Sequence, residues 1–105
     1  MSTFVGPPNV AAEVTFLSTA AGGRKSPTAE QGRYCCPMRL GDEYFDACID
    51  LSATGSIGPG QSLQCQLWFL WPEGAMSNVS VGKEFTLHEG KLIGHGKITA
   101  VYAGT

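Results

Sequence analysis

Charged residues are scarce in this chain. Lysine, arginine, aspartate and glutamate together make up 15% of its 105 residues, whereas about 25% is usual in soluble domains. The formal net charge is -2, so the chain lacks the overall basic field that draws many proteins to nucleic acid. Neither GxxxxGKS/T nor GxGxxG occurs in the sequence. P-loop and Rossmann nucleotide sites, which need those glycine-rich loops, are therefore excluded.

Long apolar segments are also missing. Residues 1–10 have neither the basic nor the apolar stretch of a secretion signal, and we interpret them as a short tail. Residues 51–72 carry no charge, but the unbroken apolar run inside them is only Leu67 to Trp71. A membrane-spanning helix needs about 20 apolar residues. The run is typical of a buried strand, and we expect no membrane partner and a cytoplasmic location.

The four cysteines lack the spacing of a metal site. Cys35, Cys36, Cys48 and Cys65 form no CxxC pair and accompany no paired histidines at zinc-binding spacing. Cys35 and Cys36 are adjacent, so on a strand they point to opposite faces and cannot easily serve one ion. We therefore predict no metal and no other cofactor. We also predict reduced thiols, mostly buried as small apolar residues.

Alternation of apolar and polar residues is the strongest pattern in the sequence. It is typical of half-buried antiparallel strands, and glycine and proline stand between the alternating segments. Six short strands separated by such turns predict a small all-β barrel, because closing the sheet removes edges that few charges protect. A chain of this size holds one core, so we expect a tail over 1–10 and one domain over 11–105. The expected strands are 11–18, 33–40, 44–51, 62–71, 84–88 and 97–102.

No catalytic group stands out. Asp42 and Glu43 follow Gly41 in a predicted turn, where we expect solvated carboxylates rather than an acid–base pair. His88 alternates with the apolar Leu87 and is expected to face solvent. No serine lies in a GxSxG context and no nucleophile is placed beside a base. We therefore expect a protein that is not an enzyme.

Two features could serve binding. The loop Gly22-Gly23-Arg24-Lys25 is either an anion nest, in which backbone amides converge beside two cations, or a turn with solvated charges. Trp68 and Trp71 flank a chargeless strand segment and point to opposite faces. We expect one of them in the core and the other on the outer surface with Leu70 or Tyr34, as a patch that contacts a protein.

Ordered motifs along the chain resemble the third, C-terminal domain of bacterial elongation factor Tu. The resemblance spans about residues 11–103 and implies a small six-stranded antiparallel β-barrel. In the family pattern His95 falls at a turn and bulge position between two glycines. The motifs are Glu13-Val14 to Leu17-Ser18, Gly22-Gly23-Arg24-Lys25-Ser26-Pro27, Gly58-Pro59-Gly60-Gln61, Leu70-Trp71-Pro72, Glu84-Phe85-Thr86-Leu87-His88-Glu89-Gly90 and Gly94-His95-Gly96-Lys97-Ile98.

The resemblance also implies a binding face. The family domain contacts the T-stem of aminoacyl-tRNA, packs on a GTPase domain and is not itself catalytic. Arg24 matches a tRNA-contacting arginine, Lys25 stands where the family has histidine, and Glu89 and Gly90 match a contacting Glu-Gly pair. No nucleotide is expected, because the chain as given holds no GTPase domain.

The chain departs from that face at two family positions. Trp71 replaces a lysine that would pair with phosphate, and the family's glutamine falls near Tyr34 or Cys35. Phosphate contacts supply most nucleic-acid affinity, so losing a lysine weakens the RNA interpretation. We therefore expect a non-enzymatic binding module with a protein partner or a second copy of itself, and one form of this function is a mimic or competitor of the factor. The alternative is a module that binds tRNA or another RNA in translation elongation.

Overall fold

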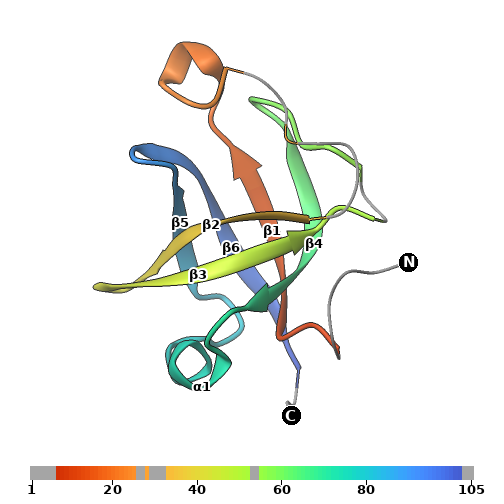
Figure 1. The fold of residues 1–105 in the computed structure, drawn as a ribbon, viewed down its shortest axis with the longest axis vertical. Coiled ribbons are helices and arrows are strands. Elements are labelled where there is room, and N and C mark those ends of the chain that lie inside the picture. The colour runs from red at the N-terminus through yellow and green to blue at the C-terminus, as the bar shows by residue number, and fades with distance from the viewer. Residues whose placement is uncertain (1–6, 26–27, 29–32, 53–54, 103–105) are drawn as a thin grey trace.

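The computed structural model describes residues 7–25, 28, 33–52 and 55–102. Six strands form a closed antiparallel barrel in the order β1-β4-β3-β2-β5-β6 (Figure 1). This confirms the all-β, six-stranded barrel expected from the alternating pattern. The strands are β1 (Val10–Phe16), β2 (Arg33–Leu40), β3 (Glu43–Asp50), β4 (Ser62–Phe69), β5 (Glu84–His88) and β6 (Leu92–Val101).

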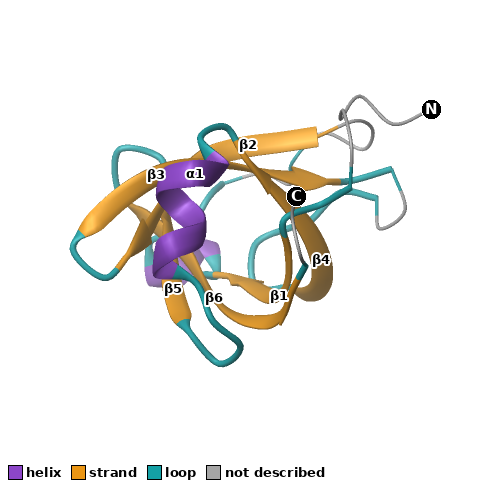
Figure 2. Cartoon of the chain, turned by 90° about the horizontal axis from the view of Figure 1, so that it is seen from below, coloured by secondary structure: helices purple, strands orange, loops and turns teal. Residues whose placement is uncertain are grey.

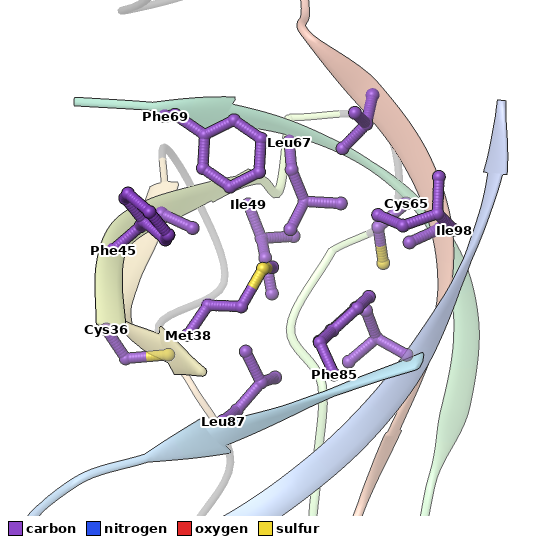
Figure 3. Close-up of a cluster of buried hydrophobic side chains, with 14 of the residues drawn as sticks. Cys36, Met38, Phe45, Ile49, Cys65, Leu67, Phe69, Phe85, Leu87 and Ile98 are labelled. Carbon is purple, nitrogen blue, oxygen red and sulfur yellow. The ribbon is translucent and has the colours of Figure 1, made fainter. Parts of the chain in front are cut away.

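The core is the inner side of the barrel, and every strand contributes alternate residues to it. Figure 3 shows side chains from several strands meeting there, with Met38 and Leu67 among them. Their neighbours along each strand point outward and are mostly polar, as the alternation predicted. The strand residues of this core cluster are Val10, Ala12, Val14, Phe16, Cys36, Met38, Leu40, Phe45, Ala47, Ile49, Cys65, Leu67, Phe69, Phe85, Leu87, Ile93 and Ile98.

Strand β6 begins earlier than expected, and His95 lies inside it rather than in a turn. His95 pairs with Thr15 of β1 and Thr86 of β5. The glycine beside it has a packing role: a Cβ on Gly96 would lie 2.4 Å from the Phe85 ring and 2.6 Å from the Glu13 carbonyl oxygen. The family pattern suggested a bulge because glycines usually break strands. Here glycine allows an aromatic ring to lie against the backbone.

Strand β4 ends earlier than expected, at Phe69, and a short helical segment follows. The helix α1 (Pro72–Ala75) has proline at its first turn, a position where the missing amide is not needed. It continues into the 3-10 turn η2 (Met76–Asn78) and lies at one end of the barrel (Figure 2). Ala75 is fully buried in the core cluster, so this segment closes that end. Among the described residues, no helix has the length and apolar character needed to cross a bilayer.

Pro37 limits the pairing between β2 and β5. Within the described residues, these strands are paired only at Met38 with Leu87 and at Arg39 with Thr86. Proline has no amide hydrogen to donate to a ladder, and the pairing stops next to it. The first half of β2 therefore faces the β5–β6 turn without a shared ladder, and side chains bridge this part of the seam.

Cys35 and Cys48 form a disulfide, so the prediction of reduced thiols was wrong for two of the four cysteines. The β2–β3 hairpin places them directly opposite each other, with Cα atoms 4.0 Å apart. Cys36 and Cys65 point inward and are free thiols. Strand register creates this pair, which the spacing of neighbours in the sequence does not show directly. Disulfides are typical of oxidising compartments and are rare in the reducing cytoplasm. The disulfide therefore does not support the cytoplasmic location, which stays a prediction.

Gly96→Ala should lower the free energy of unfolding by about 1–3 kcal/mol, because its methyl group displaces Phe85 or the β1 backbone. Lys97→Ala, at the next and exposed position, should change stability by about 0.5 kcal/mol or less. Urea denaturation of both variants measures the difference. Equal stabilities would contradict the proposed close approach at Gly96.

Candidate functional site

The resemblance-derived residues Arg24 and Glu89 are brought together in the fold. An ion pair joins the Arg24 guanidinium to the Glu89 carboxylate, and the Tyr34 hydroxyl donates to the same carboxylate oxygen. The guanidinium also lies 5.1 Å from the Tyr34 ring centroid. We call these three residues the seam cluster, since they bridge β2 and the β5–β6 turn beyond the two residue pairs of the described β2–β5 ladder. The Arg24 charge is therefore paired with an acidic side chain of the same protein.

The other two residues of that predicted face are exposed. Lys25 follows Arg24 in the loop, and Gly90 occupies the β5–β6 turn with φ of 72°. The neighbouring Lys91 ammonium donates to the Gly23 carbonyl oxygen at 3.2 Å and holds the two loops together. The face keeps Lys25 as an exposed cation, while Arg24 is paired with an acid.

The anion-nest interpretation of Gly22 and Gly23 does not hold. The amide of Gly22 donates to the Thr19 carbonyl, and the amide of Gly23 donates to the Ser18 carbonyl. These bonds end the 3-10 turn η1 (Thr19–Ala21), with Gly22 in the left-handed conformation. Both amides are used within the turn, so they do not converge on a ligand.

Neither tryptophan lies in the core, which corrects the expectation that one of them would. Trp71 comes after β4 has ended; it is 60% exposed and packs over Phe45 at a ring separation of 6.2 Å. Trp68 is half-buried on the outer face of β4, and Leu70 is 63% exposed. Alternation continued past Phe69 would place Trp71 inward, but β4 ends at Phe69. Trp68, Leu70 and Trp71 all belong to the outer surface.

A groove next to these residues was not foreseen from the sequence. It has a volume of about 530 Å³ and lies where the β2–β5 pairing ends. Its aromatic wall contains Tyr44, which is 56% exposed and stacks edge-on against His88 at 5.2 Å. The lining residues are Pro37, Tyr44, Phe45, Asp46, His88, Gly90 and Lys91.

His88 is half-buried at this groove rather than solvent-facing as expected. Its Nε2 lies 2.7 Å from the Thr86 hydroxyl, and its ring packs on Tyr44. Asp42 and Glu43 are exposed, in agreement with solvated carboxylates. Across the described parts of the chain, no three histidine, cysteine or acidic side chains gather as a metal site would require.

The free thiols are held in the protonated form. Burial raises the pKa of Cys36 from 9.0 to about 11, although the His88 backbone amide counteracts part of the effect. Burial also raises the pKa of Cys65 to about 11. Thiolates are the nucleophilic form of cysteine, so near neutral pH neither side chain has the character of a catalytic nucleophile.

The groove and the exposed apolar residues that follow β4 both adjoin β3. A backbone hydrogen bond of 3.0 Å from the Leu70 amide to the Asp46 carbonyl oxygen brings the end of β4 beside the groove. We call the surface formed by Pro37, Tyr44, Asp46, Leu70 and Trp71 the β3 face.

Comparison with known proteins returned no matching family model and no similar curated protein.

The two buried thiols predict a loss of stability at alkaline pH. Their pKa is about 9 in the unfolded chain and about 11 in the folded one, so between these values the folded state binds more protons. The free energy of unfolding should fall by about 2 kcal/mol per thiol as the pH rises through this window. Urea denaturation without oxygen, compared with Cys36→Ala/Cys65→Ala, isolates the effect. An unchanged slope in that variant would contradict it.

Proposed function

We propose that this chain is a non-enzymatic protein-binding module whose contact surface is the β3 face. The observation that carries the proposal is the exposure of Leu70 and Trp71, at 63% and 60%, beside a groove walled by Tyr44. Large apolar side chains grouped on a surface are typical of protein contacts, and aromatic residues supply much of the binding energy in such contacts.

The charge arrangement favours a protein partner over RNA. The Arg24 guanidinium is paired with Glu89, and the Lys91 ammonium is bonded to a backbone carbonyl. RNA affinity depends on cations that neutralise phosphates, and here Glu89 would compete with any phosphate for Arg24. The net charge of -2 adds no general attraction to nucleic acid.

The resemblance to the third domain of elongation factor Tu supplies one form of this function. That family domain packs against a neighbouring protein domain, so a similar barrel is suited to binding a protein surface. We propose that the chain acts as a mimic or competitor of the factor, or pairs with a second copy of itself. Both forms use an apolar face that a partner covers.

Replacing the apolar part of the β3 face should abolish partner binding without loss of fold. Leu70→Ser/Trp71→Ser removes the two most exposed of the large apolar side chains on the face. Val101→Ser is the control, because Val101 is an exposed apolar residue on β6, which lies opposite β3 in the barrel order. The immobilised proteins are compared for capture of partners from lysate, and light scattering measures their oligomeric state. Circular dichroism verifies the fold of each.

Two results would support the proposal. Either a partner is retained by the wild type and Val101→Ser but lost by the double variant, or a wild-type dimer dissociates only in the double variant. Retention of the same proteins by all three forms, with a monomer throughout, would contradict it. Binding of tRNA that falls with salt and is lost in Arg24→Ala/Lys25→Ala, but not in the β3-face variant, would establish the RNA alternative instead.

A further inference from the structure

The disulfide joins one accessible sulfur-bearing residue to one covered residue. Cys35 is exposed on the outer face of β2, whereas Cys48 of β3 is 1% exposed. Register explains the difference: Cys48 pairs with Cys35 on one side and with Trp68 of β4 on the other. Directly opposite residues on a sheet face have their side chains in contact range. Cys48 is thus flanked by the bonded Cys35 on one side and by the large Trp68 side chain on the other.

We propose that Cys35 is a site of reversible thiol–disulfide exchange with a small-molecule thiol of the glutathione class. The incoming thiolate attacks the Cys35 sulfur and forms a mixed disulfide there. The bond between the two cysteines breaks, and its electron pair leaves on the Cys48 sulfur, which then takes up a proton. A second thiolate attacks the mixed disulfide, releases the Cys35 thiolate and leaves as the oxidised small-molecule disulfide.

Access decides which of the two sulfurs is attacked. Exchange requires the thiolate to approach the sulfur along the existing bond, so it depends on accessibility as well as on thiol pKa. Cys35 is exposed to solvent, while Cys48, on the same side of the sheet between Cys35 and Trp68, is 1% exposed. The structure therefore assigns the mixed disulfide to Cys35.

The fold also keeps Cys48 in place to reverse the reaction. Strands β2 and β3 remain paired from Arg33 with Asp50 to Leu40 with Glu43, and this ladder does not depend on the sulfur bond. The released Cys48 thiol consequently stays opposite Cys35, where its thiolate can displace the small molecule and restore the disulfide. Reduction of the protein disulfide releases one small-molecule disulfide, and its re-formation from the dithiol uses one. No other oxidant or reductant takes part.

The other two cysteines cannot exchange places with this pair while the barrel is closed. Cys36 and Cys65 point into the core and are 6% and 2% exposed. Both side chains lie on the inner side of the barrel, whereas the disulfide lies on the outer side of β2 and β3, so neither sulfur can reach it in the closed barrel. They serve as internal controls for modification of the folded protein. The exchange does not rest on the proposed binding function.

The experiment treats the folded full chain with glutathione and maps the mixed disulfide by mass spectrometry. Cys48→Ser, exposed to oxidised glutathione, should carry one glutathione on Cys35. In Cys35→Ser, the Cys48 thiol should react at least about tenfold more slowly, because it is covered. Circular dichroism verifies that each variant keeps its strand structure.

A second measurement uses the wild type and does not depend on the variants folding. Graded mixtures of reduced and oxidised glutathione, quenched with acid, should interconvert the disulfide, the mixed disulfide on Cys35 and the dithiol while the circular dichroism stays native. Glutathione found on Cys48, Cys36 or Cys65 of the folded chain would overturn the assignment. A disulfide that resists reduced glutathione until denaturant is added would overturn the proposal itself.

Discussion

Strand register is the constraint on which this barrel depends. A shift of one residue in any pair would turn that strand's apolar side chains outward and its polar side chains inward. The hairpin between β2 and β3 shows how strongly register is determined: Gly41, with φ of 62°, takes the first position of a two-residue turn, and Leu40 pairs with Glu43. Everything on the outer face of these two strands, including the disulfide, follows from that one turn.

Among the described residues, the seam between β2 and β5 has fewer backbone pairs than the other seams of the barrel. Pro37 removes a donor there, and the seam cluster of Arg24, Tyr34 and Glu89 takes over the connection with side chains. Residues that a translation-factor resemblance would assign to RNA are therefore used to hold the barrel together. A partly buried ion pair with a hydroxyl bonded to it is a stabilising contact, and it leaves less charge for phosphate.

Both the proposed contact surface and the proposed exchange site lie on the outer side of strands β2, β3 and β4. Exposed apolar residues gather at one end of β3, and the disulfide crosses to β2 further along it. On the opposite strand of the ring, β6, the absence of a side chain at Gly96 lets the Phe85 ring pack against the backbone. The two sides of the barrel thus differ: Gly96 of β6 contributes to core packing, whereas the outer side of β3 carries the proposed contact surface.

The sequence by itself determined the architecture. Alternation of apolar and polar residues defines which side of a strand is buried, and glycine and proline mark its turns, so six strands and a barrel could be predicted locally. The position of the Cys35–Cys48 bond was also within reach, since stepping outward equally from Leu40 and Glu43 leads to both residues. What only the tertiary structure decided are contacts between strands far apart in the chain. The ion pair of Arg24 with Glu89, the groove between Tyr44 and His88, and the outward position of Trp71 depend on barrel closure and on where β4 ends. Such contacts are set by the packing of distant segments, for which local periodicity carries no information.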